Sequence, residues 1–145
     1  MGGIIDTNIL LYAANLDARE QSSAAAFLER AAAFREPWFI TEGIFYEFLR
    51  VATHPKVFDR PLAWEEAVDF LQAFWRSPQF EVLSAGERHW DTLQEILEEL
   101  NHPTGNLFFD IRTVVLMREH GVREIYTTDT DFLQFKKIKV INPLR

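Results

Sequence analysis

The chain has 145 residues and a mass of 16.9 kDa, the length of one ordinary domain, so we expect a single domain over residues 1–145. Hydrophobic residues make up 48% of the sequence and aromatic residues 14%, and this composition excludes an intrinsically disordered chain. The sequence contains no cysteine, which excludes disulfides, zinc–thiolate and iron–sulfur sites, and thiol nucleophiles.

The charge balance limits the ways in which the protein can bind its partners. Its 15 Lys and Arg against 22 Asp and Glu give a net charge of −7. Proteins that bind nucleic acid nonspecifically through its phosphates are normally basic, so a nucleic-acid function would need a local source of positive charge. No apolar run reaches the roughly 18 residues of a membrane span, and residues 1–6 do not form a signal peptide. We therefore expect a cytoplasmic protein without a membrane partner.

Short strands and helices alternate along the chain. The predicted strands are residues 4–5, 38–40, 80–83, 125–127 and 138–141. The predicted helices are residues 9–14, 18–34, 42 to just before Pro55, 61–75, 87–100 and 106–120. Asp6 or Asn8 can cap the first helix, Thr41 is expected to cap the third, and Gly121 to end the last. This alternation predicts an α/β fold in which helices cover both faces of a parallel sheet.

Four acidic residues are predicted to converge at the carboxyl ends of the strands, where open parallel sheets bind ligands. Asp6 follows the first strand and Asp129 the fourth, whereas Glu47 and Asp110 lie on helices that can reach the same edge. Each has an ordinary structural interpretation when taken alone. These are a helix cap for Asp6, a dipole partner for Asp110, a solvent-reaching boundary residue for Glu47, and turn residues capping a short helix for Asp129 and Asp131.

Convergence of the four carboxylates would create strong repulsion. Two carboxylates about 5 Å apart repel by roughly 3 kcal/mol at an effective dielectric constant near 20. Protons or cations must relieve this repulsion, and hard carboxylate oxygens favour Mg²⁺ or Mn²⁺. The pattern therefore predicts a metal site at the strand ends. By contrast, Glu95, Glu98 and Glu99 are expected to form a solvated helix face.

Several motifs occur in a fixed order that spans essentially the whole chain. They are Asp6-Thr7-Asn8-Ile9-Leu10, Glu47-Phe48-Leu49-Arg50-Val51, Asp110 at the start of a helix that runs to Gly121, Thr127-x-Asp129-x-Asp131-Phe132, and Asn142-Pro143-Leu144. This ordered set resembles the PIN-domain nucleases and, more narrowly, the VapC-type ribonuclease toxins. Ile111 departs from the family, in which a small residue commonly follows the third acid.

The resemblance implies a PIN-like three-layer α/β/α fold, with a parallel sheet of about five short strands, and Mg²⁺- or Mn²⁺-dependent endoribonuclease activity. It implies catalytic roles for Asp6, Glu47, Asp110 and Asp129, and metal binding by Asp6, Asp110, Asp129 and Asp131. Thr127 matches the family's hydroxyl beside the site, and Asn8 matches its supporting amide. Arg50 and Arg112 are candidate contacts for the RNA backbone.

The resemblance also implies partners. The protein would be the toxin of a type II toxin–antitoxin pair, would cleave RNA, and would be inhibited by a cognate antitoxin. A homodimer is expected, consistent with the large aromatic content. Two other interpretations stay open, namely a non-catalytic PIN-like module that binds a metal or a partner, and a metal-dependent phosphohydrolase of small molecules. Metal-dependent cleavage of RNA rather than of a small phosphate ester would separate these interpretations.

Overall fold

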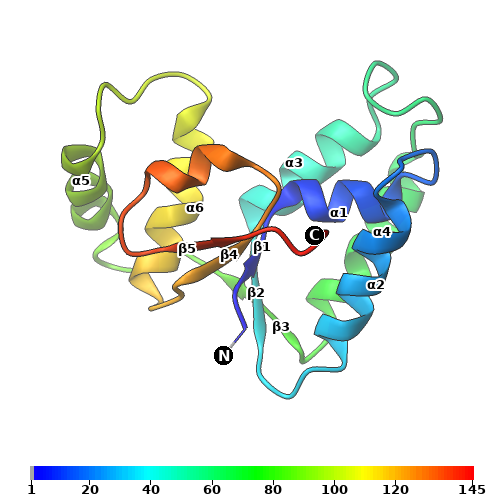
Figure 1. Ribbon diagram of the computed structural model, residues 1–145, viewed down its shortest axis with the longest axis horizontal. Helices are drawn as coiled ribbons and strands as arrows, with labels where there is room; N and C mark the ends of the chain where they lie inside the picture. Colours follow the sequence, from blue (N-terminus) through cyan, green and yellow to red (C-terminus); the bar gives the residue numbers. More distant parts are fainter. Residues whose placement is uncertain (1) are drawn as a thin grey trace.

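The computed structural model describes residues 2–145 of the chain and has a five-stranded sheet at its centre (Figure 1). The strands are β1 (Ile4–Ile5), β2 (Trp38–Thr41), β3 (Phe80–Leu83), β4 (Glu124–Tyr126) and β5 (Lys139–Ile141). Their order is β3-β2-β1-β4-β5, and all neighbouring strands are parallel. The predicted α/β fold with a parallel sheet is confirmed, and the first strand in sequence lies in the middle of the sheet.

Helices cover both faces of this sheet. They are α1 (Thr7–Ala14), α2 (Gln21–Ala32), α3 (Glu42–Ala52), α4 (Trp64–Trp75), α5 (His89–Glu99), α6 (Leu107–Glu119) and the 3₁₀ helix η1 (Thr130–Gln134). In Figure 1, helices α1 to α4 lie on one side of the sheet, and α5 packs with α6 on the other. Within residues 2–145, none of the helices has the length and apolar character needed to cross a membrane.

The expected caps begin and end the helices that lead to the strand ends. The Asp6 Oδ1 atom accepts a hydrogen bond from the Thr7 N–H at 2.8 Å and caps α1. The Thr41 Oγ1 atom accepts one from the Ile44 N–H at 3.0 Å and caps α3. Gly121 follows α6 with a φ of 69°. Glycine is favoured in this left-handed conformation because it has no Cβ, so it ends the helix as predicted. Local side chains and backbone conformation therefore fix the start of α3, which carries Glu47, and the end of α6, which carries Asp110.

Two helix starts were predicted too early. Pro61 does not open α4, which begins at Trp64. The start of this helix is marked by a hydrogen bond from the Ala63 N–H to the Glu66 side chain at 3.1 Å. Arg19 and Glu20 form a turn, and α2 begins at Gln21 rather than at residue 18. Both preceding segments have a helix-compatible composition, so composition alone does not locate the first turn.

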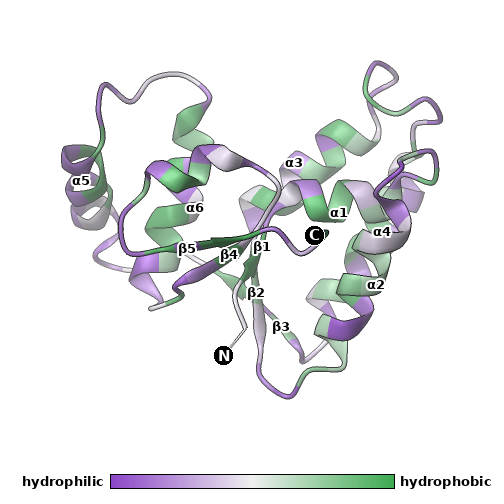
Figure 2. Ribbon diagram, viewed as in Figure 1, coloured by the Kyte–Doolittle hydropathy of each residue, from purple (hydrophilic) through white to green (hydrophobic). Residues whose placement is uncertain are grey.

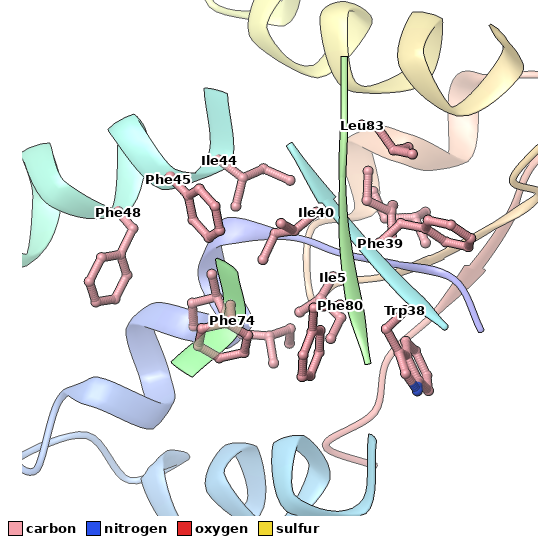
Figure 3. Packing of buried hydrophobic residues seen from close by; sticks show 14 of the residues in the cluster. Ile5, Trp38, Phe39, Ile40, Ile44, Phe45, Phe48, Phe74, Phe80 and Leu83 are labelled. Atoms are coloured by element: carbon pink, nitrogen blue, oxygen red, sulfur yellow. The ribbon is translucent and has the colours of Figure 1, made fainter. Parts of the chain in front are cut away.

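The core fills the space between the sheet and its two helix layers. Ile4 and Ile5 of β1 have no exposed surface. Figure 3 shows side chains of α3 and α4 packed beside those of the strands, where the Phe74 and Phe80 rings meet edge to face with centroids 4.9 Å apart. Figure 2 shows hydrophobic residues concentrated in the strands and in α6, whereas the visible face of α5 is mostly hydrophilic. This core fixes the strand ends, and hence the residues that follow them.

Candidate active site

The carboxyl ends of β1 and β4 bring Asp6 and Asp129 together. The Asp6 N–H donates to the Tyr126 carbonyl oxygen at 3.0 Å, so the pairing of the two strands extends to the first acid. Asp6 is only 8% exposed. Asp129 begins η1, where its Oδ1 atom accepts a hydrogen bond from the Asp131 N–H at 2.8 Å. The predicted cap and turn roles of Asp6 and Asp129 are thus confirmed, and the same residues face a common edge of the sheet.

A single hydroxyl group, that of Thr127, links the acids of β1 and β4. Its Oγ1 atom donates to Asp6 Oδ2 at 2.8 Å and accepts hydrogen bonds from the Asp129 N–H and from Asn8 Nδ2, both at 3.0 Å. The Asn8 Oδ1 atom accepts a hydrogen bond from the Thr128 N–H at 3.3 Å. A hydroxyl has one donor and two lone pairs, and all three are used here. The predicted supporting residues Asn8 and Thr127 therefore lie beside Asp6 and orient its carboxylate.

Burial dominates the protonation of Asp6. It raises the pKa of Asp6 from the ordinary 3.8 to about 6, because the charged form loses its water. Hydrogen bonds from the Thr127 hydroxyl and the Thr7 N–H favour the carboxylate and act in the opposite direction, lowering this pKa. The nearby charges of Glu47 and Asp129 raise it again. Asp6 therefore lies close enough to both acids to experience their charge.

Glu47 reaches the same edge from α3. Its side chain is exposed, as expected for a boundary residue. The Glu47 Oε2 atom accepts a hydrogen bond from the Thr7 hydroxyl at 3.1 Å, which ties α3 to the first turn of α1. The carboxylate is therefore held toward the acids of β1 and β4 rather than left free in solvent.

Three acids form a group with the spacing of metal ligands. Asp110, Asp129 and Asp131 each offer a carboxylate oxygen, and these oxygens all lie within 4.8 Å of one another. Asp110 comes from the first turn of α6, whereas the other two come from the start of η1. Asp6 was predicted as a fourth ligand, but it lies outside this group of three and is buried beside it.

The acids repel one another most strongly at Asp110. Burial, followed by the charges of Asp6, Asp129, Glu47 and Asp131, raises the pKa of Asp110 from 3.8 to about 7. All five acids identified from the sequence therefore interact through their charges, although the residues lie far apart in the chain. The expected convergence and its electrostatic cost are both present.

An all-carboxylate donor set of this kind fits a hard divalent cation. Mg²⁺ and Mn²⁺ prefer oxygen ligands, and a cation among Asp110, Asp129 and Asp131 would offset the repulsion that raises the Asp110 pKa. Asp6 Oδ1 accepts one hydrogen bond and keeps a second lone pair, so Asp6 can hold the ion directly or through a water molecule.

The acids open into a cavity of about 450 Å³, and a second cavity of about 420 Å³ lies next to it between α3 and α6. Glu47, Arg50 and Phe109 line both cavities. Arg112 lines only the second, where it lies 3.6 Å from the Glu42 carboxylate. Of the two predicted RNA contacts, Arg50 is therefore beside the acids and Arg112 is one cavity away.

Sequence reasoning missed three residues at this edge, namely Thr7, Tyr46 and Phe109. Thr7 orients Glu47, and the two aromatic residues line the second cavity. Their positions in the sequence could have indicated a place near the site, because Tyr46 directly precedes Glu47 and Phe109 directly precedes Asp110. Aromatic residues next to helical acids are usually assigned to a core, and nothing in the sequence marked these two as exposed.

Comparisons with known proteins agree with the fold and identify the family. The family described as PIN domain matches residues 4–138. Ribonuclease VapC48 of Mycobacterium tuberculosis is 29% identical over 143 residues, which cover 99% of this chain and 98% of that protein. Ribonuclease VapC24 of the same species is 33% identical over 143 residues, covering 97% of this chain and 95% of that protein.

A solved structure shows the same fold at lower sequence identity. It is the crystal structure of VapBC2 from Rickettsia felis bound to a DNA fragment from their promoter. A chain of that structure matches with a TM-score of 0.70 and 18% identity, covering 98% of each chain. Since the family match and these similarities extend over nearly the whole chain, the protein belongs to the PIN domain family and is a VapC-type member of it.

Proposed function

We propose that the protein is a Mg²⁺- or Mn²⁺-dependent endoribonuclease and the toxin of a type II toxin–antitoxin pair. The observation that carries this proposal is the grouping of Asp110, Asp129 and Asp131 within 4.8 Å, beside the buried Asp6. The relatives named as VapC ribonucleases, which match over nearly the full chain, support the same activity.

The three grouped acids would hold the metal ion directly, and Asp6 beside them would hold it directly or through water. A bound Mg²⁺ or Mn²⁺ would lower the pKa of a water molecule and offset the negative charge that develops on the phosphodiester. In the hydrolysis, one P–O ester bond breaks, the water oxygen bonds to phosphorus, and a proton reaches the leaving oxygen. These roles account for a cluster of carboxylates that would otherwise only destabilise the fold.

The chain's own residues would position the reactants. The Thr127 hydroxyl fixes the Asp6 carboxylate through a 2.8 Å hydrogen bond. The Thr7 hydroxyl holds Glu47 Oε2 at 3.1 Å, and we assign to Glu47 Oε1 the hydrogen bond from the attacking water. Arg50 lines the acid cavity and would contact a phosphate of the RNA, which supplies local positive charge in a protein of net charge −7.

The protein partners follow from the same assignment. The Rickettsia felis structure is named as a VapBC complex, so we propose that a VapB-like antitoxin binds and inhibits this chain. We also propose that the protein forms a homodimer, because large hydrophobic side chains such as Leu16, Trp75 and Trp90 are exposed.

An RNA cleavage assay tests the proposed activity. Purified protein is incubated with total RNA in Mn²⁺, with and without excess chelator. We expect cleavage only with Mn²⁺, and a loss of at least about 10²-fold for Asp110→Asn, the scale found when an electrostatic contact to the transition state is removed. Glu98→Gln on the exposed face of α5 is the control and should keep the wild-type rate.

Two outcomes would favour the other interpretations. Metal-dependent hydrolysis of p-nitrophenyl phosphate without cleavage of RNA would indicate a small-molecule phosphohydrolase. Metal binding without hydrolysis of either substrate would indicate a non-catalytic module. Equal rates for Asp110→Asn and Glu98→Gln would show that the active site lies elsewhere.

A further inference from the structure

The cavity between α3 and α6 has the composition of a nucleobase site. One face of α3 lines it with Tyr46 and Arg50, and one face of α6 lines it with Phe109 and Arg112. Tyr46 is 71% exposed and Phe109 is 69% exposed, so each wall presents an aromatic ring that the core does not cover. Stacking on aromatic rings and guanidinium groups is the general way in which proteins bind unpaired bases.

The position of the cavity indicates which base it would take. It shares Glu47, Arg50 and Phe109 with the acid cavity, so the two spaces meet along one wall. In each helix the acid directly follows the aromatic residue, as in Tyr46–Glu47 and Phe109–Asp110. Asp110 lines only the acid cavity and Tyr46 only the second one, whereas Glu47 and Phe109 lie on the wall between them. A phosphodiester at the acids would therefore place an adjoining nucleotide at the second cavity.

The guanidinium of Arg112 is held at this cavity. It lies 3.6 Å from Glu42, across the first turn of α3. It also passes over Gly43, where a Cβ atom would meet the guanidinium, so the close approach depends on glycine at this position. A planar cation in this position offers both a stacking face and hydrogen-bond donors to the edge of a base.

We propose that this cavity, lined by Tyr46, Phe109 and Arg112, binds the nucleobase next to the scissile phosphate and thereby selects the sequence that is cut; the proposal rests on the ribonuclease function proposed above. Its volume of about 420 Å³ accommodates one base with its ribose. Arg50, which lines both cavities, contacts the phosphate that joins the two nucleotides.

The first test measures base binding without any cleavage. Ring signals of Tyr46 and Phe109 are followed by NMR while each of the four ribonucleoside 5′-monophosphates is added in Mg²⁺. We expect at least one nucleotide to shift both rings and ribose 5-phosphate, which has no base, to leave them unchanged. The Phe108 ring, on the same helix but outside the cavity lining, is the internal control. Equal shifts with ribose 5-phosphate, or none with any nucleotide, would overturn the proposal.

The second test measures selection during cleavage. Random-sequence RNA decamers are cleaved in Mn²⁺, and the products are sequenced. The wild-type protein should prefer certain bases at one position beside the cut. Tyr46→Leu and Phe109→Leu should flatten this preference and raise KM about tenfold, as expected for a lost stacking contact, with kcat within about twofold. Phe108→Leu and Trp64→Leu should retain the wild-type preference and KM.

The two tests separate this proposal from the one on which it rests. Nucleotide binding without Mn²⁺-dependent cleavage would refute the ribonuclease function but support the base site. Cleavage with unchanged preference and KM in both leucine variants would refute the base site alone. If the leucine variants convert a dimer into a monomer in sedimentation and the nucleotides cause no ring shifts, the cavity is covered by a second copy of the chain, and the base site is wrong.

Discussion

At the scale of single residues, the hydroxyl of Thr127 orients the Asp6 carboxylate and lowers its pKa. It is the donor of the 2.8 Å hydrogen bond to Asp6 Oδ2, and this bond lowers the Asp6 pKa against the effect of burial. Because it also accepts the Asp129 N–H, a change at Thr127 affects both acids. Thr127 is therefore a positioning residue, and its effect can be separated from that of the acids by a pH profile.

Replacing Thr127 with valine should move the pH dependence of cleavage. The variant loses the donor to Asp6 but keeps the side-chain shape, so the pKa of Asp6 should rise further above about 6. The acid limb of the kcat/KM profile should therefore shift to higher pH. Thr127→Ser keeps the hydroxyl and should restore the wild-type limb. A uniform loss of activity at every pH in Thr127→Val would show a merely structural role.

The charge of Asp110 destabilises the metal-free protein, because the group is partly buried and lies among other acids. Its pKa is raised to about 7, so the folded state binds a proton that the unfolded state, with an ordinary pKa of 3.8, releases. The stabilisation is present below about pH 4 and is lost as the pH rises to about 7. Asp110→Asn should therefore raise the melting temperature of the metal-free protein at pH 8 and flatten its decline between pH 5 and pH 8.

The matched variant Asp6→Asn should behave differently, because the structure gives Asp6 hydrogen-bond donors on both oxygens. An amide at this position would place an N–H group against Thr127 and Asn8, which already donate there. In EDTA, the melting temperature of Asp110→Asn should thus be higher than that of the wild type. The melting temperature of Asp6→Asn should be no higher than that of the wild type. Adding Mg²⁺ should stabilise the wild type, since a ligand that binds only the folded state shifts the equilibrium.

Among single residues, the acids and the supporting residues Asn8 and Thr127 could be predicted, but the ion pairs between helices could not. Asp6, Asp110 and Asp129 follow strand ends or begin a helix, which are positions that the sequence pattern locates. Glu99 was expected on a solvated face, but it forms two 3.0 Å hydrogen bonds with Arg118 of α6, and this correction needs the packing of α5 on α6. Long-range pairs of this kind depend on tertiary contacts and leave no local signal.

At the scale of elements, α3 carries Glu47, Tyr46 and Arg50, so its N-terminal cap supports both cavities. The buried Thr41 hydroxyl accepts the Ile44 N–H at 3.0 Å. Thr41→Val should leave this N–H unpaired and lower the free energy of unfolding by about 1–2 kcal/mol. The measurement is urea unfolding, with Thr41→Ser as the variant that keeps the cap. Equal midpoints for the wild type and Thr41→Val would show that the cap does not stabilise α3.

The succession of elements was readable from the sequence, but their arrangement was not. The short runs Ile4–Ile5 and Phe80–Leu83 alternate with amphipathic helices, and this alternation predicts a parallel sheet. The order β3-β2-β1-β4-β5 depends on how the crossovers pack. This order places β4 beside β1. The hydrogen bond from Thr127 to Asp6 and the grouping of Asp110 with Asp129 and Asp131 both depend on that neighbourhood.

At the scale of the whole molecule, the distribution of charge would make the proposed RNA binding depend on few contacts. The net charge is −7, and within the described residues that line the two cavities the cations are Arg50 and Arg112. Under the proposed function, nucleic acid would therefore be attracted by the bound metal ion and these two guanidinium groups, whereas the remaining surface, taken together, would repel it.

The salt dependence of binding measures this number of contacts. For single-stranded nucleic acid, the slope of log K against log salt concentration is about −0.7 for each neutralised phosphate. Arg50, the arginine assigned to a phosphate, thus predicts a slope of about −0.7 for a decamer in potassium acetate at fixed Mn²⁺, determined from KM. Arg50→Gln should reduce the slope by about 0.7, whereas Lys56→Gln, an exposed residue outside both cavity linings, should leave it unchanged. A slope steeper than about −4 would mean that a basic surface outside the two cavities binds the RNA, and the two-cavity description of substrate binding would then be wrong.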